Sequence, residues 1–170
     1  MNTKEKVLIH KGMDMVRRMQ FAEALQTFDK AISQNPEITE ACNNRGVALF
    51  RLGRVEEALE SYNRALSLEP KNLDALRNKG VALSSMGRLD EALECYNSVL
   101  KAGGDALDME AMATVLVGQG RTEEALQCMQ RAVEMQPLER FEEEIEVLKS
   151  MVEQKPEVNQ SSEKPAEGKE

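Results

Sequence analysis

The feature that most constrains this chain is a repeat with a period of about 34 residues. The residues that return at this spacing are Gly12, Gly46 and Gly80, then Ala24, Ala58 and Ala92, then Phe28, Tyr62 and Tyr96, and finally Pro36 and Pro70. A period of this length is typical of a supersecondary unit that cannot bury its apolar face alone. Stacked neighbours must therefore complete the hydrophobic core.

Small residues at fixed places within each unit indicate two closely packed helices. Glycine inside a helix costs about 1 kcal/mol relative to alanine, so Gly46 predicts a close approach of the second helix, with Ala58 opposite it. Gly53, after the first helix, predicts a turn, because glycine adopts the left-handed conformation at little cost. In the first unit, Met19 stands at the place of this turn glycine.

This pattern resembles the tetratricopeptide repeat, a helix-turn-helix unit of the same length. The resemblance covers four units, about residues 5–36, 39–70, 73–104 and 106–137, followed by a capping helix over 138–153. It implies an all-α fold, a right-handed α-solenoid of antiparallel helix pairs, for a domain that spans residues 3–153.

The segment after Pro137 has apolar residues at three- and four-residue steps, which predicts an amphipathic helix. One interpretation is a cap with a polar outer face on the fourth unit. The other is a homo-oligomer contact through residues 138–153, in which Phe141 and Ile145 form a self-association surface. Residues 154–170 have almost no apolar side chains, so we expect a disordered acidic tail.

Composition and charge narrow the class of protein. Aromatic residues make up only 4% of the 170 residues, which fits a helical array packed on small and aliphatic side chains. The net charge of −8 argues against a general nucleic-acid binder, because phosphate binding needs a basic face. Charged residues interrupt residues 1–16, and no run approaches membrane-spanning length. We therefore expect a cytoplasmic protein with neither a nucleic-acid nor a membrane partner.

The residues that carry enzyme or metal chemistry do not form a recognisable set. Cys42, Cys95 and Cys128 are widely spaced and His10 is the single histidine, so we expect buried or half-buried cysteines and no metal or other cofactor. Paired glutamates fall at helix starts, where they favour the helix dipole. A catalytic carboxylate would need a desolvated pocket and an oriented partner, and we predict no enzyme activity.

The surface left free by the packing pattern is the candidate site. The resemblance implies that one stripe of each first helix lines a concave groove. The predicted partner-binding residues are Ile9, His10, Met13, Val16, Arg17, Asn43, Asn44, Val47, Phe50, Arg51, Arg77, Asn78 and Val81. Asparagine amides could donate to and accept from the backbone of an extended ligand. The alternative is that these are ordinary solvated helix residues.

Family members that hold the acidic tails of heat-shock chaperones use a clamp of lysines, asparagines and an arginine. Here Asn44 matches one place, whereas Ile9, Met13, Asp74 and Asn78 occupy the others. The cations for charge-assisted bonds are missing, so that activity is not expected. We predict a non-enzymatic adaptor that binds a peptide or protein segment in its groove, with a self-assembling structural repeat protein as the alternative.

Overall fold

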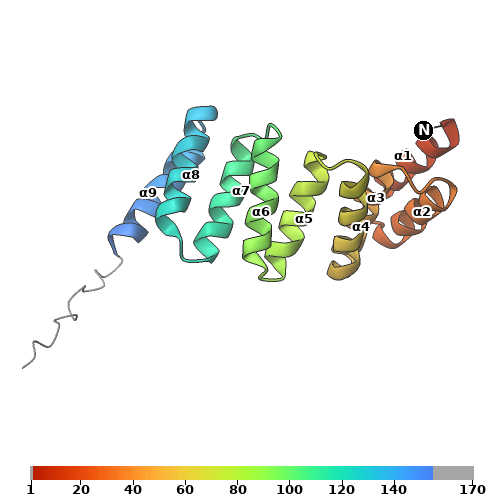
Figure 1. The fold of residues 1–170 in the computed structure, drawn as a ribbon, viewed down its shortest axis with the longest axis horizontal. Helices are drawn as coiled ribbons and strands as arrows, with labels where there is room; N and C mark the ends of the chain where they lie inside the picture. Colours follow the sequence, from red (N-terminus) through yellow and green to blue (C-terminus); the bar gives the residue numbers. More distant parts are fainter. Residues whose placement is uncertain (1, 155–170) are drawn as a thin grey trace, which may run out of the picture.

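The computed structural model describes residues 2–154, which form nine α-helices and no strand (Figure 1). The helices are α1 (Thr3–Arg17), α2 (Phe21–Gln34), α3 (Thr39–Arg51), α4 (Val55–Leu68), α5 (Leu73–Ser85), α6 (Leu89–Lys101), α7 (Ala106–Gly118), α8 (Thr122–Met135) and α9 (Glu139–Glu153). The predicted all-α solenoid is confirmed. None of these helices is long and apolar enough to cross a membrane. The tail predicted to be disordered, residues 154–170, lies outside the described residues except for Gln154, which follows α9.

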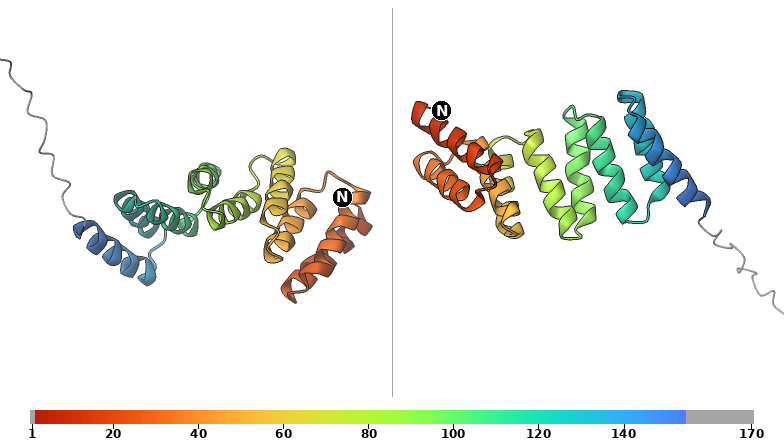
Figure 2. Two further views of the ribbon diagram at one scale, coloured as in Figure 1. Left: turned by 90° about the horizontal axis from the view of Figure 1, so that it is seen from below. Right: turned by 180° about the vertical axis from the view of Figure 1, so that it is seen from behind.

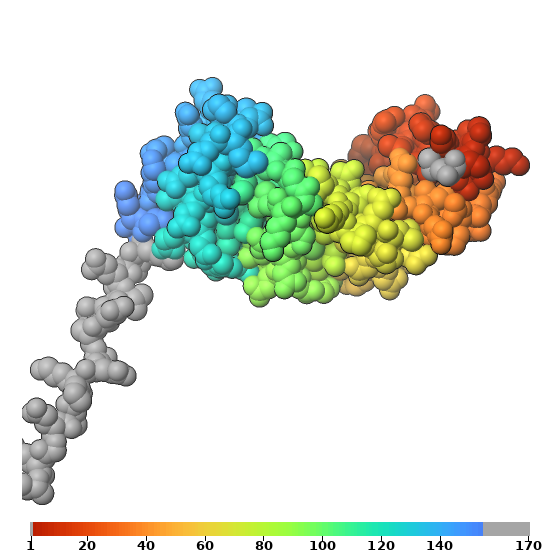
Figure 3. All heavy atoms as spheres, turned by 45° about the horizontal axis from the view of Figure 1, so that its top comes forward, coloured from red at the N-terminus to blue at the C-terminus, as the bar shows by residue number. Residues whose placement is uncertain are grey.

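Each helix packs against the next one along the chain, which produces an elongated array (Figure 2). The space-filling view follows the same order from the N-terminal unit to the C-terminal helix (Figure 3). The two ends of the array therefore lie far apart. The main cluster of buried residues runs from α2 to α9, and two smaller clusters lie at the first two junctions between units.

The close approach within a unit is a contact between a helical glycine and an aromatic ring. A Cβ atom added to Gly46 would lie 2.4 Å from Cε1 of Tyr62, and one added to Gly12 would lie 2.5 Å from Cε1 of Phe28. The prediction of a close approach at Gly46 was correct, but the nearest atoms belong to the ring of Tyr62 and not to Ala58, which was expected there.

The third and fourth units vary this contact in two ways. A Cβ on Gly80 would lie 3.1 Å from Tyr96, a close contact that a small shift of the ring would relieve. The fourth unit has Ala113 in place of the glycine and the fully buried Met129 in place of the ring. A thioether side chain is flexible enough to pack around a methyl group. Both members of the contact therefore differ in the fourth unit, and its two helices still pack closely.

The turns between paired helices share one backbone conformation. Gly53, Gly87 and Gly120 have φ angles of 77°, 75° and 72°, and Met19 has a φ of 61°. The first unit therefore makes the same turn as the others with a residue that has a side chain. A left-handed conformation costs a residue with a Cβ roughly 1–2 kcal/mol. Met19 thus carries a strain that the three glycines avoid.

The last helix packs its apolar side on the fourth unit. Phe141, Ile145 and Leu148 are buried and belong to the main core. The hypothesis that Phe141 and Ile145 form a self-association surface was wrong, because both side chains are buried in the core of the same chain.

The glycine–ring contact predicts an order of sensitivity to one added methyl group. We expect Gly46→Ala to lower the free energy of unfolding by about 2 kcal/mol, because the buried ring of Tyr62 would have to move. Gly80→Ala is the matched control, since its looser contact lets the better helix propensity of alanine, about 1 kcal/mol, offset the strain. Urea denaturation measures both, and an equal loss for the two variants would contradict this account.

The strained turn predicts a stabilising substitution. We expect Met19→Gly to raise the free energy of unfolding by about 1 kcal/mol, because glycine adopts this φ without a steric cost. Gly53→Ala, the reverse change at the equivalent turn, should lower it by a similar amount. Thermal unfolding measures both variants. A lower melting temperature for Met19→Gly would show that the contacts of the Met19 side chain stabilise the fold by more than its left-handed backbone conformation costs.

Candidate functional site

The first helices of the first three units lie next to one another along one side of the array. Beyond the neighbours that follow them in the chain, α1 contacts α3 and α3 contacts α5. Helices on the inner side of a curved stack approach one another in this way. We call the surface formed by α1, α3, α5 and α7 the inner face.

Four of the predicted apolar residues form a half-buried surface on two adjacent helices of this face. Met13 and Val16 belong to α1, and Val47 and Phe50 belong to α3. All four pack against the core and remain partly open to solvent. We call them the inner stripe. Val81 on α5 extends the apolar character and is 46% exposed.

Ile9 does not belong to this surface. Its side chain is completely buried against Ala31, Ile38 and Ala41. The prediction of Ile9 as a groove residue was wrong, because the approach of α3 to α1 closes over that position. The packing of the first two units uses the side chain instead.

The asparagines join neighbouring helices. Asn43 is buried, and its Oδ1 accepts a hydrogen bond of 3.0 Å from Nδ2 of Asn78. This bond links α3 to α5, so part of the hydrogen-bonding capacity predicted for a ligand is used within the protein. Asn44, one residue further on, is half-buried.

The predicted arginines and His10 differ in their contacts with the rest of the protein. The guanidinium of Arg51 lies 6.0 Å from the ring centre of Phe21, and Arg17 occupies the equivalent place on α1 in an exposed position. Neither arginine takes part in an ion pair within residues 2–154. Nδ1 of His10 lies 2.8 Å from the carbonyl oxygen of Lys6 on the exposed side of α1.

Arg77 is held inside a cluster of carboxylates. Its Nε and Nη2 donate hydrogen bonds of 2.6 Å to the two oxygens of Asp108, which is buried at the start of α7. Asp105 and Asp74 lie 3.5 and 3.7 Å away. The prediction that Arg77 binds a partner is therefore unsupported by its surroundings, because the protein's own acids already surround the guanidinium.

The charges of this pair depend on each other. Burial alone would raise the pKa of the Asp108 carboxyl, but the hydrogen bonds from Arg77 and from the backbone near Asp105 hold that pKa below its ordinary value. The same hydrogen bonds raise the pKa of Arg77. The pair therefore stays charged and links the third unit to the fourth.

An apolar cleft that the sequence analysis missed lies between α7 and α9. It has a volume of about 260 Å³ and is lined by Ala113, Thr114, Val117, Met129, Glu144, Val147, Leu148 and Met151. Val147 and Met151 are exposed. They lie four residues apart in the sequence, next to the buried residues Phe141, Ile145 and Leu148. This second apolar edge of α9 could have indicated the cleft from the sequence. We call this feature the α7/α9 cleft.

The described residues contain no group of three or more His, Cys, Asp or Glu side chains that could hold a metal ion. Cys42 and Cys95 are buried and Cys128 is half-buried, as predicted. Burial raises the pKa of all three thiols, which keeps them protonated at neutral pH.

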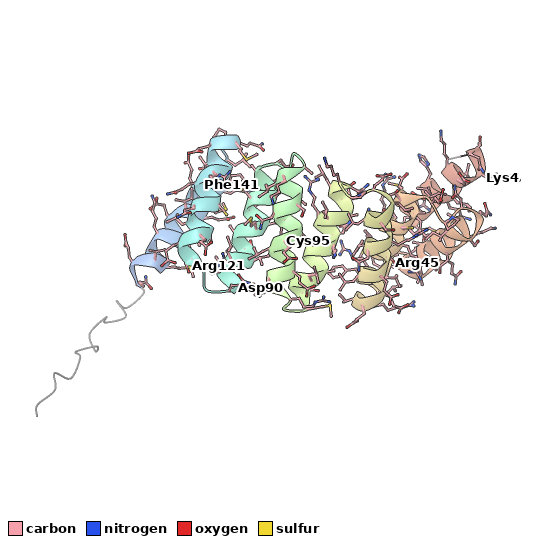
Figure 4. The ribbon with its side chains drawn as sticks, in the orientation of Figure 1. Lys4, Arg45, Asp90, Cys95, Arg121 and Phe141 are labelled. Carbon is pink, nitrogen blue, oxygen red and sulfur yellow. The ribbon has the colours of Figure 1, made fainter. Side chains whose placement is uncertain are left out.

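One carboxylate at the start of each of the helices α4, α6 and α8 pairs with an arginine. Arg54, for example, donates two hydrogen bonds of 2.6 Å to Glu57, and Arg121 makes the same pair of bonds to its own helix-start glutamate. Arg121 and Asp90 lie together at one edge of the array (Figure 4), where Gln119 donates to Asp90 over 2.7 Å. These carboxylates are exposed and paired, as expected for solvated helix ends.

The fold and the inner face define a class of protein, the all-α repeat solenoid that offers a surface to other proteins. Family models of the tetratricopeptide repeat match residues 39–72 and 73–138, which is more than half of the chain. The chain belongs to the tetratricopeptide repeat family. A comparison with curated proteins found no match.

Solved structures agree with this fold. MamA from Desulfovibrio magneticus RS-1, from residue 41 to its end, superimposes with a TM-score of 0.77 at 23% identity, over 90% of this chain and 92% of that one. A tetratricopeptide repeat protein from Parabacteroides merdae gives 0.79 at 23% identity, over 89% and 61%. YrrB, described as having an unusual peptide-binding site, gives 0.58 at 30% identity, over 64% and 57%.

The ion pair between the third and fourth units predicts a pH-dependent contribution to stability. We expect Arg77→Leu to lower the free energy of unfolding by about 2–3 kcal/mol at neutral pH, because the buried carboxylate of Asp108 would lose its cation. The contribution of Asp108 is present above the ordinary pKa of an aspartate, about 4, and is lost as the pH falls through its lowered value. The difference between the two proteins should therefore shrink in acid.

Arg88→Leu is the control for this prediction. Arg88 donates the same two bonds of 2.6 Å to Glu91, but both side chains are exposed. An exposed pair contributes little, so this variant should unfold almost like the wild type. Urea denaturation at neutral and acidic pH separates the cases, and equal losses for both variants would mean that burial of Asp108 plays no part.

Proposed function

We propose that this protein is a non-enzymatic interaction module that holds a segment of a partner protein on its inner face, over the inner stripe. The observation that carries the proposal is the half-buried apolar surface of Met13, Val16, Val47 and Phe50 on two neighbouring helices. Proteins with this fold generally act as interaction scaffolds without enzyme activity. A cytoplasmic location stays a prediction from the sequence.

The geometry favours a segment with apolar side chains at its centre. An aromatic ring such as that of Phe50, partly open and supported by the core, is the kind of residue that dominates binding energy when a partner covers it. Arg17 and Arg51 lie outside any ion pair of the described chain, so an acidic residue beside the apolar anchors would find a cation. Asn44 is the amide that we assign to the backbone of the partner.

The peptide-binding site of YrrB lends support of a general kind, because that protein shares the fold. The alternative of a self-assembling protein rests on a different part of the molecule, the two ends of the array.

Selection of peptides on the wild-type protein tests the proposal. We expect the selected peptides to combine apolar residues with an acidic one. Phe50→Ala should weaken their binding by about 2 kcal/mol, close to thirtyfold, because it removes the aromatic anchor. Calorimetric titration measures the change, and melting curves establish that the variant is folded at the temperature used.

Met86→Ala is the matched control. Met86 is an exposed apolar residue that caps the C-terminal end of α5 and does not belong to the inner stripe, so its truncation should leave binding unchanged. Peptides that bind Phe50→Ala as tightly as the wild type, or that lose affinity in the control, would place the interface elsewhere.

A further inference from the structure

The N-terminal end of the array exposes a residue that the inner units bury. Val7 stands one repeat period before Ala41 and two periods before Ala75, and both alanines are 0% exposed because the preceding unit covers them. Val7 has no preceding unit in the described structure and is 61% exposed. Lys4 and Lys11 flank it at three- and four-residue steps, which places all three on one side of α1.

The C-terminal end exposes a corresponding apolar residue. Phe141, Ile145 and Leu148 repeat the spacing of the buried residues Met109, Ala113 and Leu116, which makes Val147 the counterpart of Val115. Val115 is 3% exposed and Val147 is 60% exposed. The α7/α9 cleft opens beside Val147, where a regular array would be closed.

The charges at the two ends are opposite. Helix α1 carries Lys4, Lys6, Lys11 and Arg17 against Glu5 and Asp14, whereas α9 carries six glutamates against Arg140 and Lys149. Figure 4 labels Lys4 and Phe141, which mark the two ends. Lys4 and Lys11 take part in no ion pair among the described residues. Opposite charge beside matching apolar residues is the arrangement that steers two surfaces together.

The rim of the cleft carries two crowded carboxylates. Glu144 lines the cleft, and burial together with the neighbouring carboxylate of Glu110 raises its pKa. Arg140 offsets this effect only in part, because its guanidinium is engaged by Glu110 over 2.7 Å. A cation brought by another molecule would relieve the crowding of these two carboxylates.

We propose that copies of this chain associate head to tail, with α1 of one copy seated over the α7/α9 cleft of the next. Val7 enters the cleft between Val147 and Met151, and Lys4 and Lys11 lie beside Glu144. The contact joins two different surfaces, so each copy keeps one free end and the assembly grows as an open chain. The inner stripe takes no part, and the proposal is therefore independent of the peptide-binding function.

Two variants, each blocked at one end, test the proposal. Val7→Glu places an acid where the cleft is already acidic, and Val147→Lys places a cation opposite Lys4 and Lys11. Both residues are exposed, so the fold should survive, and melting curves check this. We expect the wild type to gain mass with concentration in sedimentation velocity at low salt, and less so at high salt. Each variant alone should self-associate about tenfold or more weakly.

The mixture of the two variants gives the decisive result. Val7→Glu keeps an intact cleft and Val147→Lys keeps an intact α1, so an equal mixture should form complexes that neither variant forms alone. Val81→Glu, an exposed substitution on the inner face, is the control and should assemble like the wild type. A wild type that stays monomeric, a mixture that stays monomeric, or single variants that still assemble would each overturn the proposal.

Discussion

The contact between a helical glycine and an aromatic ring sets the geometry on which the rest of this structure depends. Gly12 with Phe28 and Gly46 with Tyr62 bring the two helices of a unit so close that no Cβ fits between them. The fourth unit reaches the same packing with an alanine and Met129. Val16 and Phe50 follow the packed glycines by four residues and Met13 and Val47 follow them by one, so the inner stripe runs along the edge of the packed side of each first helix. Packing within the units thus determines which residues remain available for partners.

The junctions between units are less uniform than the units themselves. The first two junctions bury Ala41 and Ala75 at the repeat position where the third buries the charged Asp108. Arg77 compensates this charge across the junction, since an unpaired buried carboxylate would be strongly destabilising. The third junction therefore depends on a specific ion pair, whereas the first two depend on close packing of methyl groups.

The period was enough to predict the helices, the turns and the packed glycines, because these features repeat with the sequence. It could not predict what differs between units. Ile9 was predicted on the free stripe of its helix, but it is buried against residues of the neighbouring helices, and its counterpart Asn43 is buried as well. Arg77 was predicted to bind a partner, but its guanidinium is bound to Asp108, which stands where the earlier units have Ala41 and Ala75. The α7/α9 cleft depends on how α9 packs beside α7, and the only sign of it in the sequence was the second apolar edge of Val147 and Met151.

Helix α1 has two surfaces with different neighbours, and this separates the two proposed interactions. Met13 and Val16 belong to the inner stripe, whereas Lys4 and Val7 belong to the open end. Side chains on opposite sides of one helix can change without a shared contact, so their effects should be independent. If copies join head to tail, the inner stripes follow one another along the chain of copies. A partner with several binding segments would then gain affinity through multivalency, without any new contact within one copy.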